Sequence, residues 1–512
     1  MARTDGDDVY HNMNSYQQTN SNPTPSTMEP EDNEGGEASG IIVSTIDRTW
    51  ASKSLWNFIW MSVFFSANHG CVVACLSLAT ARLGSVGAWQ SGILYIFYTG
   101  SAVLGATYVV KQLGPRNALI TGMGLYCVYV GCFLVATLSP EIETPAALLG
   151  AAVGGVGAGF LWTAQGSYFS RAAEDHAQAL QQPVQESNQR MASIFAFLYL
   201  AEEVGLRALS TLLLGQGLSW SVVFGSYSAV TVLSTFCMVF VRDYPTTSNL
   251  SVSTAEEETN TQSTGTGPSS SVWYKVTAAW QLMRNDPKMK YMIGLNAVFG
   301  FAAAFLNSYV NGEVVGVVTN DPQAKSVGIF NAWVSCVAAA MSLLFGRVSK
   351  KVGNGPVLIL GALCFFGVVF PFVIIPNTRQ WGVALLIFIY TCHGCGRATF
   401  EGTLKATFAD YFAYEKEGAF ACIILQNGLA GAIGYILTFT LLCSKESRYC
   451  IAYSNGSLHD VLSFELLVIV SAMAAIGGYW RASSLRQAEI RAMEAAAATS
   501  EDTAMIPSAE TE

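Results

Sequence analysis

The sequence predicts an all-α protein that crosses a membrane many times. Hydrophobic residues make up 51% of the chain and charged residues only 12%, and the mean hydropathy is positive. Apolar stretches of about 20 residues, the length that crosses a bilayer as a helix, recur along most of the chain. Such stretches must be helical, because a backbone in hydrocarbon has to satisfy its own hydrogen bonds. The lipid bilayer is therefore the first partner that the sequence predicts.

The apolar spans divide into two groups of six, separated by a polar stretch. Each is long enough to cross a bilayer and leaves some residues for tilt. In chain order they cover residues 54–80, 87–110, 116–138, 145–169, 189–214, 219–241, 291–314, 326–348, 355–376, 380–404, 418–443 and 460–481. Pro371 lies inside the ninth span, where the missing backbone N–H predicts a kink.

Polar segments lie before, between and after the two groups of spans. The first 50 residues hold few bulky apolar side chains, a composition typical of disorder, and the central Ser- and Thr-rich stretch is typical of a linker. Most acidic residues lie in these segments, so the net charge of −9 predicts solvated tails and no nucleic-acid partner. The predicted domains are a disordered cytosolic tail (1–50), a six-helix half (54–241), a cytosolic linker (242–288), a second six-helix half (289–481) and a cytosolic tail (482–512).

Basic residues gather in the loops on one side of the predicted spans. This side holds sites such as Lys111, Arg242, Lys350 and Lys351. Because basic loops stay in the cytosol, we expect both termini to be cytosolic, in the plasma membrane or an endomembrane.

The last non-cytosolic loop carries two candidate modifications. Asn455 begins an Asn-Gly-Ser sequence, a legal glycosylation acceptor on that face. Cys443 and Cys450 flank the same segment and are a candidate disulfide pair.

An offset of 239 residues relates the two groups of spans. It aligns KQLGPRNALITG with KKVGNGPVLILG, and so matches Gly114 with Gly353. It also matches Asn68 with Asn307. These matches predict two parallel structural repeats.

Polar side chains inside the spans are the candidates for a binding site. A charged side chain at mid-membrane costs about 2.5–3.5 kcal/mol even on lenient scales, so these residues should face protein or water. The candidates are Asn68, His69, Gln165, Asn307, Arg397 and Glu401. Two simpler readings stay open: Lys405 and Glu401 reach the interface by snorkelling, and His69 is an interior histidine with satisfied partners.

Glu203 and Arg207 lie within the fifth span at a spacing of four. A glutamate one turn before a base is the favourable order for a helical ion pair. We expect a buried charge pair here, either a structural salt bridge directed toward the other half or a proton site.

LWTAQGSY (Leu161–Tyr168), FADYF (Phe408–Phe412) and QNG (Gln426–Gly428) together resemble the pattern of the UNC93-like family. This family is a branch of the major facilitator superfamily (MFS). The resemblance implies an MFS-type twelve-helix bundle of two six-helix halves, in which helices one, four, seven and ten line a central cavity. Most of the polar candidates fall on these helices.

The resemblance leaves two functions open. One is a carrier that moves an ion or small solute, or regulates its movement, by alternating access, with a part in ion homeostasis. The other is a non-transporting partner of a potassium channel or another membrane protein such as a receptor.

The sequence offers no constellation typical of an enzyme. We find no nucleophile–base set and no phosphate or dinucleotide loop in a strand–helix context. Cys392 and Cys395 with His393 look like half of a metal site, but no second half has zinc-like spacing. We therefore predict no enzyme, no cofactor and no metal.

Overall fold

The computed structural model describes residues 47–244, 280–321, 323–375, 377–412, 414–442 and 459–504. Helices dominate these ranges, and the predicted all-α membrane fold is confirmed. The first helix set contains α2 (Arg48–Leu83), α3 (Ser85–Leu104), α4 (Ala106–Leu113), α5 (Pro115–Leu138), α6 (Glu143–Leu180), α7 (Val184–Gly215) and α8 (Trp220–Met238).

The second helix set follows residue 280. It contains α11 (Pro287–Tyr291), α12 (Ile293–Ala304), η2 (Phe305–Val314), α13 (Val315–Val318), α14 (Val327–Val352), α15 (Asn354–Ile374), η3 (Thr378–Gln380), α16 (Val383–Ala398), η4 (Thr399–Leu404), α17 (Lys405–Tyr411), α18 (Lys416–Leu442) and α20 (His459–Ala504).

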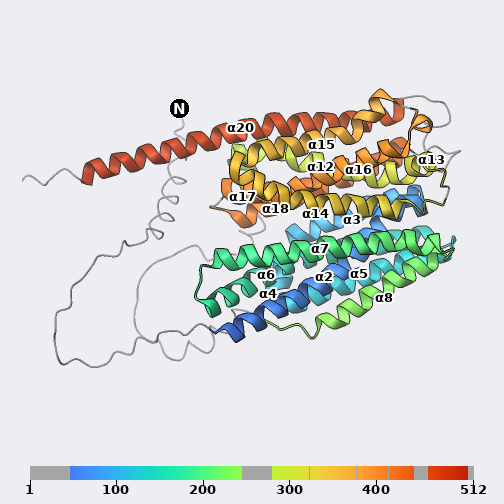
Figure 1. Ribbon diagram of the computed structural model, residues 1–512, viewed down its shortest axis with the longest axis horizontal. Helices are drawn as coiled ribbons and strands as arrows, with labels where there is room; N and C mark the ends of the chain where they lie inside the picture. Colours follow the sequence, from blue (N-terminus) through green and yellow to red (C-terminus); the bar gives the residue numbers. More distant parts are fainter. Residues whose placement is uncertain are drawn as a thin grey trace, which may run out of the picture. The chain divides into compact units, whose positions relative to one another are not determined.

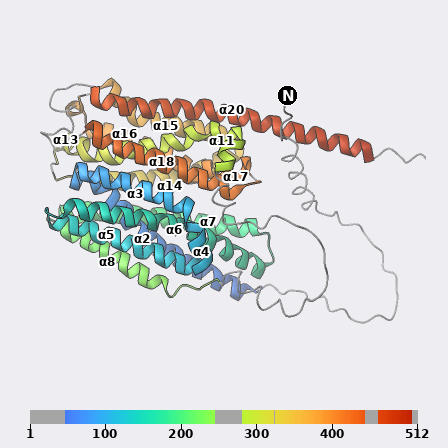
Figure 2. The same ribbon diagram turned by 180° about the vertical axis from the view of Figure 1, so that it is seen from behind.

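Most of these helices could cross a membrane. Among the described residues, ten helical segments are long and apolar enough, and α3 and α7 are not among them. In α7 the reason is its charged residues, which include Glu202, Glu203 and Arg207. Both α3 and α7 nevertheless lie beside apolar neighbours within the bundle, and α7 runs the length of it (Figures 1 and 2).

Helix ends differ from the predicted spans where a helix continues past its apolar part. The first helix begins at Arg48, inside the predicted N-terminal tail, and the Asp47 side chain caps it by accepting from the Trp50 N–H at 2.9 Å. The last helix runs to Ala504 and so includes much of the predicted C-terminal tail. The second predicted span is divided at Gly105 into α3 and α4.

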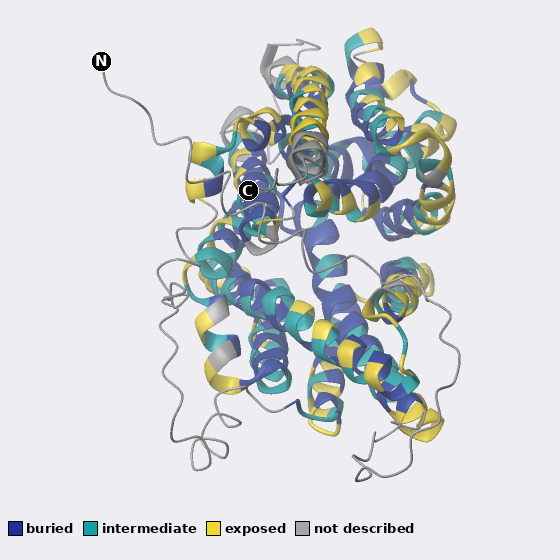
Figure 3. Ribbon diagram, turned by 90° about the vertical axis from the view of Figure 1, so that its left-hand side faces the viewer, coloured by how far each residue is buried: buried dark blue, intermediate teal, exposed yellow. Residues whose placement is uncertain are grey.

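The two helix sets form separate layers within residues 47–504. In Figure 1 most of the first set lies below and the second set above, with α3 between them. The sets meet mainly where α3 contacts α18, α7 contacts α14, and α2 contacts η2. Figure 3 shows buried residues on the inner helix faces and exposed residues outside, where lipid would cover them.

Close packing of α6 follows from its small residues. Side chains at Gly155 or Gly159 would collide with Leu94 and Ser101 of α3. The small-residue face formed by Gly155 and Gly159, four positions apart, therefore lies directly against a neighbouring helix, as this spacing allows in membranes.

The two turns that the repeat aligns have the same geometry. Gly114 ends α4 with φ 78° and Gly353 ends α14 with φ 83°. Both values lie in the left-handed region that glycine adopts without strain. Each turn joins the second and third long helices of its set.

Candidate functional site

A buried carboxylate holds two arginines at the boundary between the helix sets. Glu203 on α7 is fully buried, and both its oxygens accept from Arg397 of α16, at 2.6 and 2.7 Å. Arg207, one turn further along α7, places its Nη2 2.7 Å from Glu203 Oε1. We call Glu203, Arg207 and Arg397 the ion trio. The two-pronged contact between Glu203 and Arg397 is the strong, geometrically specific form of ion pair. It joins the first helix set to the second.

Two hydroxyl groups complete the surroundings of the ion trio. Ser335 of α14 donates to Glu203 Oε1 at 2.9 Å. Arg397 Nη2 donates to the Tyr199 hydroxyl at 3.3 Å. Charges this deep are tolerated only when paired and hydrogen-bonded. The trio meets that condition with groups from both sets.

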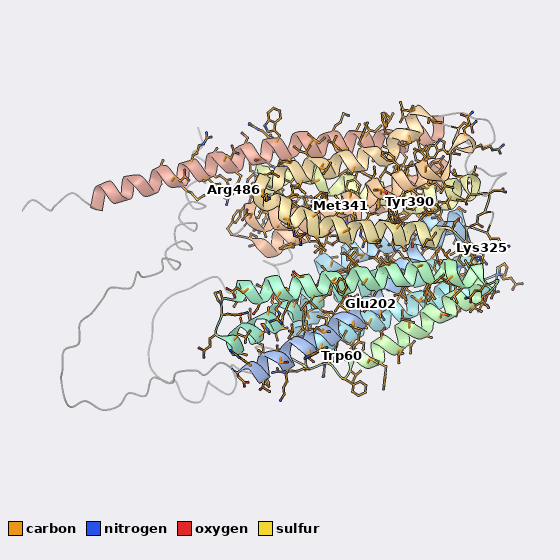
Figure 4. All side chains as sticks on the ribbon, viewed as in Figure 1. Trp60, Glu202, Lys325, Met341, Tyr390 and Arg486 are labelled. Atoms are coloured by element: carbon orange, nitrogen blue, oxygen red, sulfur yellow. The ribbon has the colours of Figure 1, made fainter. Side chains whose placement is uncertain are left out.

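Two asparagines extend the polar network to α2. Arg207 Nη1 donates to the Asn331 carbonyl oxygen of α14 at 3.2 Å, and Asn331 Nδ2 donates to Asn311 Oδ1 at 3.1 Å. Asn311, on η2, donates in turn to the Ser77 carbonyl oxygen of α2 at 3.0 Å. The hydroxyl of Tyr390, labelled on α16 in Figure 4, also donates to Asn311. The network is therefore continuous from α16 to α2.

Four polar residues of α7 form hydrogen bonds or ion pairs with residues of the second set. Tyr199, Glu203, Arg207 and Thr211 follow one another at intervals of four, so they share one helical face. Thr211 donates to the Lys325 carbonyl oxygen at 2.7 Å. We call these four residues the α7 stripe. It runs from the middle of α7 toward the far end of the bundle, opposite the end where α2 begins and α20 finishes; Figure 4 labels Lys325 at that far end.

Two π-helical segments adjoin the network. Asn307 and Asn311 lie in η2, and η4 begins two residues after Arg397 and contains Glu401. Such wide turns are rare and occur frequently at functional sites. The seventh and tenth helices, which the resemblance implies as cavity-lining, therefore both depart from α-geometry beside the ion trio.

The structure brings together some of the predicted site residues. Arg397 joins Glu203 and Arg207, while Glu401 pairs with Lys405 at 2.7 Å. Asn307 accepts from Asn311 Nδ2 at 3.3 Å, and the Asn307 carbonyl accepts from Thr80 at 2.9 Å. These residues lie in or beside the polar network.

Other predicted residues lie elsewhere in the first set. Asn68 donates to the Thr231 carbonyl and the Thr235 hydroxyl of α8, at 3.1 and 3.0 Å, and so points within its own set. His69 lies among aromatic rings, with its centroid 5.1 Å from that of Trp162 and 5.6 Å from that of Tyr199. Gln165 is half-buried on α6. Asn455, Cys443 and Cys450 lie outside the described residues.

Sequence reasoning missed Tyr199, Asn331, Ser335 and Tyr390. Two signals were available. Tyr199 and Thr211 continue the four-residue spacing of Glu203 and Arg207, and Asn331 and Ser335 are one turn apart inside an apolar span. Within the described residues no group of three or more His, Cys, Asp or Glu side chains could hold a metal ion.

Solved structures share this fold at low sequence identity. The POT family transporter PepTSo aligns with a TM-score of 0.61 at 12% identity, over 85% of this chain and 98% of that one. A mutant form of the nucleoside transporter NupG gives 0.57 at 12% identity, over 85% and 99%. The inward-open xylose transporter XylE from E. coli gives 0.56 at 14% identity, over 83% and 95%. These likenesses show the fold alone.

Curated relatives confirm the predicted resemblance to UNC93-like proteins. UNC93-like protein 3 of Arabidopsis thaliana is 24% identical over 393 residues, which is 71% of this chain and 76% of the relative. Protein unc-93 homolog A of Mus musculus is 28% identical over 183 residues, 35% of this chain and 38% of that relative.

A family model of the Major Facilitator Superfamily matches residues 58–435. This range extends from α2, through the helices that carry the ion trio, into α18. The chain therefore belongs to the Major Facilitator Superfamily, as a multi-pass membrane protein similar to UNC93-like proteins.

Proposed function

We propose that this protein is a carrier, not an enzyme, and that it moves an ion or a small solute across its membrane by alternating access. The observation that carries the proposal is the two-pronged Glu203–Arg397 contact, because it joins the two helix sets through their buried middle. In alternating access the two sets rock against each other around a central site. A charge pair between them is a natural gate for that motion.

The energetics of the pair explain how such a gate is controlled. Separating one partner from a buried ion pair costs about 3–5 kcal/mol when its charge is left uncompensated. The sets therefore stay together until another charge, on a solute or a proton, takes the place of the missing partner. This requirement couples the rocking motion to binding.

The position of the contacts indicates which end is closed. The α7 stripe joins the second set from the middle of the bundle to the far end. Near the far end a side chain at Gly328 would collide with Ser210 and the Arg207 carbonyl. The basic loops predict that the far end faces away from the cytosol, so we interpret this conformation as closed on the non-cytosolic side.

Flux through purified protein in liposomes tests the proposal. We expect uptake of a cation or small solute driven by a pH or potassium gradient, and its loss in Glu203→Gln and Arg397→Ala. Arg379→Gln is the matched control, because Arg379 is exposed in the short helix η3, far along the chain from the ion trio residues of α7, and its loss should leave flux unchanged. Absence of flux for every solute, or full flux in both trio variants, contradicts the proposal.

A second function has one observation in its favour. Both oxygens of Glu203 are occupied by the chain's own groups, as expected for a permanent lock between helix sets. A non-transporting partner of a potassium channel or receptor would need such rigidity. In that case we expect a channel or receptor to co-purify with the protein, and no flux from the reconstituted protein.

We also propose that both termini are cytosolic, in the plasma membrane or an endomembrane, and that Asn455 carries a glycan. Glycosidase treatment should then shift the mobility of the native protein and leave Asn455→Gln unchanged. An unshifted native protein contradicts the glycan assignment. Mass spectrometry of peptides from non-reduced protein tests whether Cys443 and Cys450 are linked.

A further inference from the structure

The ion trio carries more positive than negative charge. The two guanidinium groups of Arg207 and Arg397 share the carboxylate of Glu203, and both contact its Oε1 atom. The nearest further acid along α16–α17, Glu401, has its own base in Lys405 at 2.7 Å. One positive charge at the set boundary is therefore without an anion of its own.

The two arginines differ in what happens to them when the sets separate. Arg207 stays with Glu203, because both lie on α7 one turn apart. Arg397 lies on α16 and loses both carboxylate contacts together with the Tyr199 hydroxyl. Of its described partners, only Ser335 of its own set remains, at 3.4 Å. The motion therefore leaves Arg397 as the uncompensated charge.

Arg207 also has an unpaired hydrogen-bond donor in the guanidinium group that contacts the shared carboxylate. Arg207 Nε is a buried donor without a hydrogen-bond partner, on a residue that is 6% exposed. Guanidinium groups present several N–H donors in a rigid fork that suits planar oxyanions. An additional acceptor here would satisfy a donor that the chain leaves unpaired.

We propose that the site binds the carboxylate of a small monovalent organic anion, which takes the place of Glu203 on Arg397. The internal carboxylate shows the geometry: two oxygens accept from two guanidinium nitrogens at 2.6 and 2.7 Å. One negative charge balances the single excess positive charge, whereas a dianion would reverse it. This inference rests on the proposed carrier function, since it names the class of solute that opens the gate.

Tyr199 indicates the chemistry of the rest of the solute. Its hydroxyl contacts Arg397, while its ring stacks on Phe195 at 5.9 Å and on His69 at 5.6 Å between ring centroids. A carboxylate that takes the place of Glu203 while Arg397 still contacts Tyr199 would therefore lie beside aromatic side chains of the first set. Aromatic faces favour flat apolar groups, so benzoate is a suitable probe alongside the smaller acetate.

Thermal stability of the full-length protein in lipid nanodiscs tests the proposal without requiring transport. Sodium acetate and sodium benzoate are titrated at constant ionic strength against sodium chloride, with acetamide and benzamide as neutral matches. We expect saturable stabilisation by the carboxylates and none by the amides. Arg397→Gln should abolish the response, and Arg379→Gln should keep it.

Glu203→Gln gives the sharpest signature, because it removes the internal competitor and keeps the side-chain shape. We expect it to bind carboxylates about tenfold more tightly than the native protein, equivalent to about 1.4 kcal/mol. A merely structural ion trio would show no such gain. If Glu203→Gln does not fold, the Arg397→Lys variant replaces it. A lysine ammonium is a point charge that lacks the guanidinium fork, so this variant should bind carboxylates more weakly than the native protein but still measurably.

The outcomes separate this inference from the carrier function. The inference is overturned if acetate and benzoate fail to stabilise both the native protein and Glu203→Gln beyond chloride, or if Arg397→Gln responds like the native protein. Flux of a neutral or cationic solute without carboxylate binding supports the carrier function and overturns the inference. Carboxylate binding with no flux of any solute supports the site and overturns the carrier function.

Discussion

Two ion pairs with similar contact distances connect very different parts of this molecule. Glu203–Arg397 has a contact of 2.6 Å with side chains 0% and 9% exposed, and it joins α7 to α16 across the two helix sets. Lys288–Glu489 also has a contact of 2.6 Å, with side chains 2% and 36% exposed, and it joins α11 to α20 within the second set. The contact distances do not separate their roles, and Lys288 is nearly as buried as Glu203. Their roles differ because the first pair joins the two helix sets, whereas the second joins two helices of one set.

The Lys288–Glu489 pair belongs to a cluster of contacts that holds α20 against the other helices of the second set. Lys288 Nζ also lies 3.4 Å from Asp286, which accepts from the Tyr414 hydroxyl. Arg486 donates to the Asp410 carbonyl oxygen at 3.2 Å. The contacts tie the extended α20 helix to its own set, so they can persist while the sets move. The comparison predicts that only the first pair governs conformation.

Glu203→Ala should have the largest effect on stability. It leaves two buried guanidinium groups without a carboxylate, and we expect unfolding free energy to fall by about 3–5 kcal/mol. Unfolding in mixed micelles of increasing denaturing detergent measures this. Glu401→Ala is the control, because its partner Lys405 is partly exposed and can be solvated. Equal losses of unfolding free energy in the two variants would show that the ion trio stabilises the protein no more than the partly exposed Glu401–Lys405 pair.

Lys288→Met should cost less stability and leave conformation unchanged. Glu489 is partly exposed, so water can replace the lost partner, and we expect a loss of about 1.5–3 kcal/mol, as for hydrogen bonds to charged groups. The same micelle assay measures it. A change in flux for a stably folded Lys288→Met would contradict the assignment of this pair to bracing alone.

Arg397→Gln should shift the balance between conformations. Without the cross-set pair we expect the population open at the far end to rise about tenfold, or about 1.4 kcal/mol. Spin labels on unnatural amino acids at Leu218 and Gln323, two exposed loop positions in different sets, would report this as a broadened distance distribution. An unchanged distribution would show that the pair does not hold the sets together, and Lys288→Met serves as the comparison.

Lys405→Ala should have the smallest effect. The Glu401–Lys405 pair lies one turn apart on one helix with both side chains about one-third exposed. Pairs of this kind contribute about 0.3–0.5 kcal/mol. A change above about 1 kcal/mol in the micelle assay, the upper end for exposed pairs, would mean that Glu401 is part of the ion trio's charge balance.

The sequence predicted the fold well because lipid imposes a simple rule. Each apolar span had to be a helix of bilayer length, whatever its neighbours. Helix ends were predicted less well, because hydropathy marks where lipid ends and not where hydrogen bonding ends. Residues 170–180 of α6 and the end of α20 are helical beyond their apolar parts.

The candidate site was predictable only where its contacts are local. Glu203 and Arg207 pair as their spacing of four predicts. Arg397, Glu401 and Lys405 share the same spacing, and only the last two pair, because Arg397 turns to Glu203, 194 residues earlier in the chain. Helical periodicity defines neighbours on one helix. It holds no information about which helix lies opposite.

The π-helical segments η2 and η4 have a mechanical consequence for this bundle. Each wide turn contains one residue more than an α turn, so a shift of the wide turn along the helix would change which residues it contains. Such a shift would rotate the side chains that it passes by about 100°, the angle between successive residues. A rotation of this kind in η4 would swing Glu401 around its axis, and one in η2 would turn Asn307 and Asn311 away from α2. Both π-helical segments therefore lie where such a rotation would rearrange the buried polar groups.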